Sequence, residues 1–224
     1  DVSIDSSGEV DIVTLDEDVF VYASPLVVNF DGVKGRYFSK RLFKALLNVV
    51  TDFGTSGGVV NNIASDRYGV TLLAPGSELE ELMSETSSNF QEFEAWEKIE
   101  LLAMLEEYPA GLQAQEGLQY IVRRLDGQQN PYYPLAPAIA WTGMNTIEFM
   151  GSAFNDEDIA YIHRLILHEK AHFLWEYTFD EQLRQDWIEV GDWFEDPESE
   201  SGWSTTQTTE FASDYAHAVN PNED

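Results

Sequence analysis

The stretch DEDIAYIHRLILHEKAHFLW, residues 156–175, decides the fold because it has the clearest helical pattern in the chain. Ile159, Ile162, Leu165 and Ile166 are followed by Phe173, so apolar residues cover most of the segment. Acidic residues occupy its first turn, where they suit the positive end of a helix dipole. The pattern predicts one helix over residues 156–175, buried through the middle of a domain.

The far end of this helix carries the pentapeptide His168-Glu169-Lys170-Ala171-His172, an HExxH motif. Histidines four residues apart lie one turn above each other, so their imidazoles can share one zinc ion. Glu169 can accept a proton from the attacking water and pass it to the leaving amine. The motif predicts zinc-dependent peptide hydrolysis, whereas the alternative is a pair of core histidines satisfied by carboxylates.

The other two histidines do not share this spacing. His163 precedes His168 by five residues, which is roughly 140° around a helix, and His217 has no partner at ligand spacing. We therefore assign neither of them to the metal.

Two short strands are predicted before the helix, over residues 138–141 and 146–150. Residues 128–137 contain three prolines and read as a rigid, extended linker. We therefore expect an α/β region over residues 1–127, acting as a recognition lobe or a cover, and a catalytic region over residues 128–224.

The N-terminal region mixes both kinds of element. The apolar alternation at Val10, Ile12 and Leu15 is expected to lead into a strand. Strands are predicted over 19–23, 26–30 and 70–73, helices over 38–53, 77–83 (capped by Ser77), 90–107 and 112–125, and a loop at Gly54, Gly57 and Gly58. The acidic run Asp16, Glu17 and Asp18 is interpreted as a solvated edge of the sheet, with a calcium site as the weaker alternative.

Composition narrows the range of partners. Twelve Lys and Arg against 41 Asp and Glu give a net charge of −29, which repels nucleic acid and anionic membranes. The chain has no cysteine, so any metal must be held by His, Asp or Glu. No apolar run reaches the ~18 residues of a membrane span. Because the sequence begins at Asp1 rather than Met, it indicates either a trimmed chain or a mature form whose signal peptide has been removed, and we expect a secreted protein.

The chain resembles the anthrax lethal factor and Pro-Pro endopeptidase group of gluzincin-type zinc peptidases. The resemblance lies in the strand at 147–150, the HExxH helix, Tyr215-Ala216 and the segment 220–224, and it covers roughly the last ninety residues. It implies that His168 and His172 are zinc ligands and that Glu169 is the general base. It also implies Glu223 as the third ligand and Tyr215 as the hydrogen-bond donor to the oxyanion.

Glu210 is a second candidate for the third ligand. It lies 38 residues after His172, and Thr208-Thr209 before it resembles the start of a helix. The resemblance favours Glu223, whereas the position of Glu223 one residue before the end of the sequence favours Glu210. Both remain open.

Taken together, these patterns predict an α/β (α+β) protein. Its zincin-like metallopeptidase domain has a small sheet and an HExxH helix and acts on a peptide or protein substrate with zinc as cofactor. The alternative is a non-catalytic or toxin-type binding module on the same fold. Glycoside hydrolysis needs only two carboxylates, and no pair among the 41 acids is singled out for it.

Overall fold

The computed structural model describes residues 2–4, 10–15, 18–21, 56–107, 114–154, 159–199, 201–206 and 221. Within these ranges the protein is a mixture of helices and small sheets, as an α/β protein should be. No helix in the described ranges is long and apolar enough to cross a membrane. The helix predicted over 38–53 and the strand predicted over 26–30 lie outside them.

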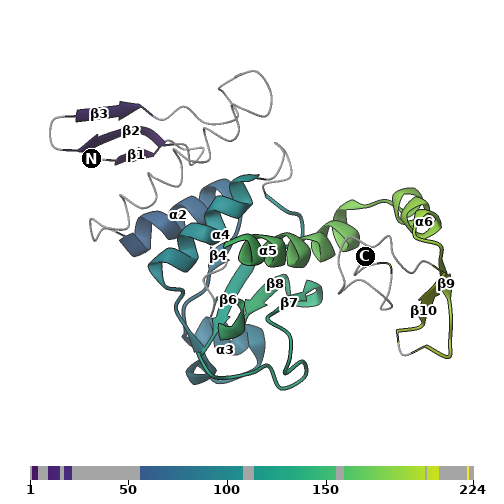
Figure 1. The fold of residues 1–224 in the computed structure, drawn as a ribbon. Helices are drawn as coiled ribbons and strands as arrows, with labels where there is room; N and C mark the ends of the chain where they lie inside the picture. The colour runs from purple at the N-terminus through teal and green to yellow at the C-terminus, as the bar shows by residue number, and fades with distance from the viewer. Residues whose placement is uncertain are drawn as a thin grey trace.

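The N-terminal strands form an antiparallel sheet of their own (Figure 1). Its order is β1 (Val2–Ile4), β2 (Val10–Leu15) and β3 (Asp18–Val21), with Ile12 opposite Val21 and Val13 opposite Phe20. The apolar alternation at Val10, Ile12 and Leu15, expected to lead into a strand, itself forms β2, and the strand predicted over 19–23 is confirmed with slightly earlier bounds.

The main sheet is built around two parallel strands, β6 (Tyr120–Arg124) and β8 (Thr146–Phe149). Parallel to β6 runs β4 (Thr71–Leu72), and β5 (Phe90–Gln91) pairs with the far end of β6 in the antiparallel sense. On the other side of β8, β7 (Ala138–Trp141) pairs antiparallel and ends the sheet. The predicted strands at 70–73, 138–141 and 146–150 are confirmed.

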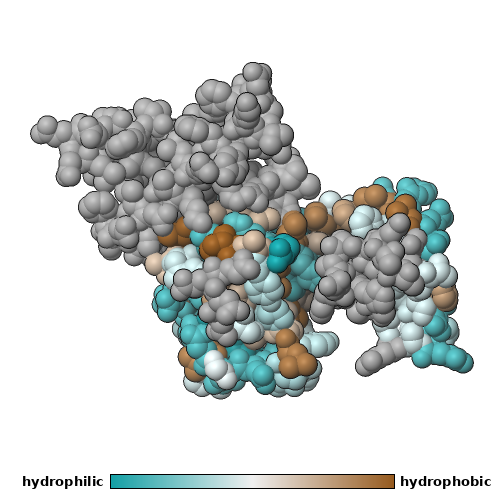
Figure 2. Space-filling view, viewed as in Figure 1, coloured by the Kyte–Doolittle hydropathy of each residue, from teal (hydrophilic) through white to brown (hydrophobic). Residues whose placement is uncertain are grey.

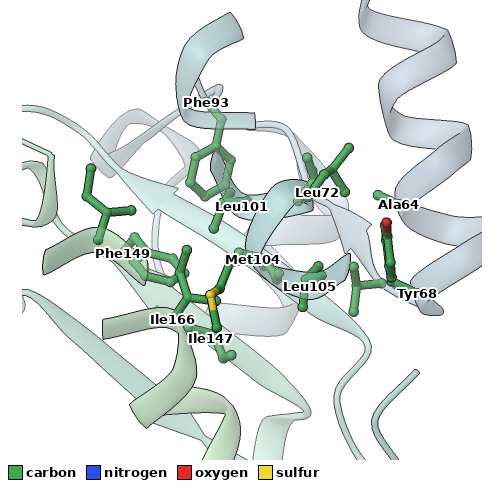
Figure 3. Close-up of a cluster of buried hydrophobic side chains, with 14 of the residues drawn as sticks. Ala64, Tyr68, Leu72, Phe93, Leu101, Met104, Leu105, Ile147, Phe149 and Ile166 are labelled. Atoms are coloured by element: carbon green, nitrogen blue, oxygen red, sulfur yellow. The ribbon is translucent and has the colours of Figure 1, made fainter. Parts of the chain in front are cut away.

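Three helices pack on one face of this sheet: α2 (Ser56–Tyr68), α4 (Ala95–Glu107) and α5 (Ile159–Phe173) (Figure 1). Alternation along the strands turns Ile121, Ile147 and Phe149 toward them. Figure 3 shows Ile147 and Phe149 among the helices' apolar side chains, which include Ala64, Tyr68, Leu101, Met104, Leu105 and Ile166. This core fixes the position of α5 relative to the sheet.

The opposite face of the sheet carries a smaller apolar cluster and buried charged residues. Helix α3 (Ser77–Met83) and the short helix η1 (Ser87–Asn89) lie there, over an apolar cluster of Leu73, Leu79, Met83, Phe90 and Val122. Beside this cluster, the buried Arg124 of β6 forms an ion pair with the buried Glu148 of β8.

Glu148 is held from three sides. Its second carboxylate oxygen accepts hydrogen bonds from Asn130 Nδ2 and Trp141 Nε1, both at 2.9 Å. Asn130 Oδ1 in turn accepts the backbone N–H groups of Tyr132 and Tyr133. Glu148 therefore ties β7 and the β6–β7 connection to the centre of the sheet.

The chain continues from α5 into a π-helical turn, η4 (Leu174–Thr178), and then into α6 (Glu181–Val190). A two-stranded antiparallel hairpin of β9 (Trp193–Glu195) and β10 (Trp203–Thr205) follows. The predicted helix at 156–175 is thus confirmed from Ile159 onward, with π-helical geometry in its last turn.

Several predicted elements are wrong. The helix expected over 112–125 is replaced by β6, because Ile121 and Val122 are β-branched and turn to opposite faces of the sheet. The helix expected from 90 begins at Ala95, since Phe90 and Gln91 pair with β6. Gly57 and Gly58, expected in a loop, lie in the first turn of α2.

Helix α3 has the predicted bounds but not the predicted cap. Gly76 is the N-cap residue, and no side chain forms the capping hydrogen bond. Glu80 Oε1 instead accepts hydrogen bonds from the backbone N–H and hydroxyl of Ser87, each at 2.7 Å. These bonds hold η1 against the helix.

The extended segment 128–137 connects two strands of one sheet. The strand before it, β6, and the strand after it, β7, both pair with β8. Pairing therefore continues across the boundary expected between residues 127 and 128.

Candidate metal centre

Helix α5 buries one stripe of side chains and leaves the stripe beside it partly open. Ile162, Ile166, Glu169 and Phe173 are buried, at intervals of four, three and four residues that place them on one side of the helix. The helix packs on α4 and on β7 (Figure 1). The motif at its C-terminal end is therefore held by the protein core.

His168 and His172 lie beside this buried stripe, and both are half-buried. Their ring centroids are 4.8 Å apart, with the ring planes at 87°. Each ring thus projects from an adjacent turn of a rigid helix while keeping some exposure. Two imidazoles on neighbouring turns are a donor set that suits zinc, so these two residues fit the metal that the sequence predicts.

Glu169 lies between the histidines in sequence, and its side chain points into the buried stripe. Only 4% of its surface is exposed. A carboxylate on the same helical turn as the two histidines and shielded from bulk water is a candidate proton acceptor.

Lys170 is completely buried, which the sequence analysis did not foresee. Loss of hydration lowers the pKa of its ammonium from 10.5 to about 7. Lys170 stands two positions from each histidine, and a helix turns by roughly 200° over two residues. Its side chain therefore projects to another side of α5, and we assign it no role at the metal.

The π-helical turn after His172 is anchored by Tyr177. Its ring stacks on Phe173, with centroids 6.3 Å apart, and its hydroxyl donates a hydrogen bond to the carbonyl of Thr142 at 2.8 Å. The ring also lies against Gly117, where an added Cβ would be 2.3 Å from two ring carbons. The end of α5 is thereby fixed to the turn between β7 and β8 and to the segment before β6.

His163 lies on a different side of α5 from the motif. Its Nε2 is 3.0 Å from Glu100 Oε2 on α4, and both side chains are largely buried. The pair joins the two helices and needs no metal to explain it.

Strand β7 forms the edge of the main sheet next to α5. Its backbone pairs with β8 on one side, and the described residues supply no strand on its other side. The connection before it exposes Tyr132, Tyr133 and Leu135, and the ring of Tyr133 lies 5.9 Å from that of Trp141. An open strand edge thus adjoins the helix that carries the motif, whereas the Tyr133 ring lies with Trp141 and Glu148 toward the opposite face of the sheet.

The remaining predicted site residues lie outside the described part of the chain. These are Tyr215, Glu210 and Glu223, together with His217 and, at the proposed calcium site, Asp16 and Glu17. The backbone of Asp18 begins β3. Within the described ranges, no three His, Asp or Glu side chains come together as a metal site. The described residues therefore supply no third ligand to stand beside His168 and His172.

Sequence reasoning also missed the charged cluster around Glu148. A signal for it exists, since Arg123-Arg124 and Glu148 interrupt otherwise apolar strand segments. In strands buried on both faces, such residues are paired with one another.

Comparison with known proteins adds no relatives. No family model matches this chain, and neither a curated protein nor a solved structure matches it.

Proposed function

We propose that this protein is a zinc-dependent peptidase of the zincin type. The observation that carries the proposal is the grouping on α5: two half-exposed imidazoles one turn apart, with a buried glutamate between them. In this proposal His168 and His172 hold the metal and Glu169 is the general base.

When bound, zinc would supply a Lewis acid that makes water nucleophilic near neutral pH. The protein's own residues do the rest. Glu169 accepts the proton of the attacking water and returns it to the leaving amine, and its burial keeps competing water away. Anchoring of α5 by the core and by Tyr177 keeps both imidazoles in place.

The edge of β7 gives a peptide substrate a place to bind. An extended peptide can add to an open strand edge through main-chain hydrogen bonds, which would set its backbone beside α5. Glu148 supports this role, because its bonds to Trp141 and Asn130 keep the edge strand and the preceding connection in one position.

The family resemblance extends the proposal beyond the described residues. Tyr215 would donate its hydroxyl to the oxyanion of the substrate. Glu223 or Glu210 would complete the ligand set, since a catalytic zinc site needs three protein ligands and one open position.

The experiment compares zinc content and hydrolysis of a peptide library for the wild-type protein and Glu169→Gln. We expect the variant to retain zinc while hydrolysis falls by about 10² to 10⁴, the usual effect of removing a general base. Glu176→Gln, an exposed position on η4, is the matched control and should leave both unchanged.

Undiminished hydrolysis by Glu169→Gln would refute the role of Glu169. A wild-type protein that binds zinc but cleaves no peptide in the library would favour a binding module over an enzyme.

The third ligand is tested by the zinc affinities of Glu223→Gln and Glu210→Gln. Loss of a partner at a metal site typically weakens binding by about tenfold or more. We expect this loss for Glu223→Gln and a mild effect for Glu210→Gln. The reverse order would assign the ligand to Glu210.

A further inference from the structure

Helix α6 presents an apolar stripe to solvent. Leu183 is 45% exposed, Trp187 41% and Val190 79%. Their spacing of four and three residues places them on one side of the helix. Figure 2 shows hydrophobic surface among hydrophilic groups where α6 lies in Figure 1.

The other side of α6 attaches it to the protein. Arg184 and Ile188 are half-buried, and Arg184 Nη2 donates a hydrogen bond to the carbonyl of Glu176 at 2.9 Å. The guanidinium also lies 6.0 Å from the centre of the Trp175 ring. At the N-terminus, Asp180 Oδ1 caps the helix by accepting the N–H of Leu183 at 2.8 Å. These contacts hold α6 from the side opposite the stripe and from its N-terminus.

Large apolar side chains exposed on successive turns of one helix mark interaction surfaces more often than chance exposure does. A tryptophan in such a stripe is a typical anchor residue at protein interfaces. The stripe thus points to a partner with an apolar face of its own.

The charge around the stripe indicates the charge of the partner that would bind there. The exposed charged residues on α6 are acidic, namely Glu181, Asp186 and Glu189. The whole chain has a net charge of −29. A second copy of this chain would bring the same sign of charge to the interface and be repelled, whereas a basic partner would be attracted.

We propose that the α6 stripe, defined by Leu183, Trp187 and Val190, docks a cationic amphipathic helix of a partner protein. Apolar residues of that helix pack on the stripe, and its Lys or Arg residues approach Asp186 and Glu189. None of the three stripe residues has a role in the proposed zinc site, so binding can be measured without hydrolysis.

The test uses a labelled Leu/Lys peptide of about five helical turns with one apolar face. Its affinity is measured by fluorescence anisotropy for the wild-type protein, for the double variant Leu183→Ser/Trp187→Ser, and for Leu135→Ser. Leu135 is the matched control, because it is 91% exposed but lies in the β6–β7 connection. We expect the double variant to bind about tenfold more weakly or worse, and Leu135→Ser to bind as wild type does.

A Lys/Ser peptide of equal charge separates docking from general attraction to an acidic protein, and it should bind much more weakly than the Leu/Lys peptide. Equal binding of the two peptides, or equal weakening by Leu135→Ser and the double variant, would overturn the proposal. A concentration-dependent wild-type dimer that the double variant abolishes would assign the stripe to a second copy instead. If the double variant does not fold, Leu183→Ser alone takes its place, because that side chain is exposed.

Discussion

At the scale of single residues, the contact between Gly117 and Tyr177 is the tightest feature next to the proposed site. Gly117 has a φ of +82°, and its missing side chain leaves room for the Tyr177 ring. A left-handed backbone alone favours glycine, but here a steric requirement is added to it.

We predict that Gly117→Ala lowers the free energy of unfolding by about 2 to 4 kcal/mol, combining backbone strain with overpacking. Gly127→Ala is the matched control: its φ is +78°, but no atom lies within 4 Å of the added Cβ. It should lose only about 1 to 2 kcal/mol. Equal losses in urea unfolding would show that the Tyr177 contact has no energetic weight.

The ion pair between Glu85 and Arg124 makes a second residue-scale prediction. Hydrogen bonds from Arg124 lower the pKa of Glu85 below its ordinary value of 4.5. Because the folded pKa lies below the unfolded one, this stabilisation is present above pH 4.5 and is lost as the pH falls through the folded pKa.

We therefore expect wild type to be more stable than Glu85→Gln at pH 7 and the difference to shrink below pH 4.5. Urea unfolding at a series of pH values measures it. A difference that stays constant down to low pH would contradict the pairing.

At the scale of helices and strands, the elements that could be predicted are those whose apolar pattern lies within a short stretch of sequence. Helix α5 is predictable because its apolar residues recur over many turns, and β7 and β8 because short apolar runs flank a turn. The motif on α5 is visible for the same reason, since His168 and His172 are four residues apart.

Features that depend on distant parts of the chain were not predictable. Strand β6 is a strand because it pairs with β4, β5 and β8, whereas the apolar residues spaced over 112–125 suggested a helix. Burial of Lys170 and the bond from Tyr177 to Thr142 likewise follow from tertiary packing. The pairing of Arg124 with Glu148 joins residues 24 positions apart.

Glu148 holds β7 and the connection before it, so removing its carboxylate should loosen both. We predict that Glu148→Ala lowers the free energy of unfolding by about 3 to 5 kcal/mol, because it deprives buried Arg124 of a partner. Chymotrypsin should also cleave faster after the exposed Tyr132.

The control is Glu92→Ala, which breaks a pair with Lys98 at 3.8 Å in which the Glu92 side chain is 69% exposed. Such pairs contribute about 0 to 1 kcal/mol. If the two variants were equally stable, the buried network would not be what fixes the edge strand.

At the scale of the whole molecule, the net charge of −29 affects the stability of the folded state. Like charges repel one another in the compact state, and salt screens them over about 10 Å at 0.1 M. We expect the free energy of unfolding to rise between about 0.02 and 0.3 M NaCl. A fall would mean that the ion pairs, which salt weakens, outweigh the repulsion.

The proposed activity also belongs to the whole molecule, because its metal ligands would come from distant parts of the chain. The most direct measurement is the zinc content per chain of the purified wild-type protein and of His172→Ala, determined by elemental analysis after dialysis. We predict close to one zinc per wild-type chain and almost none in the variant, because His172 is one of the two proposed ligands that lie in the described part of the chain. A wild-type protein without zinc, or a variant that keeps it in full, would contradict the account.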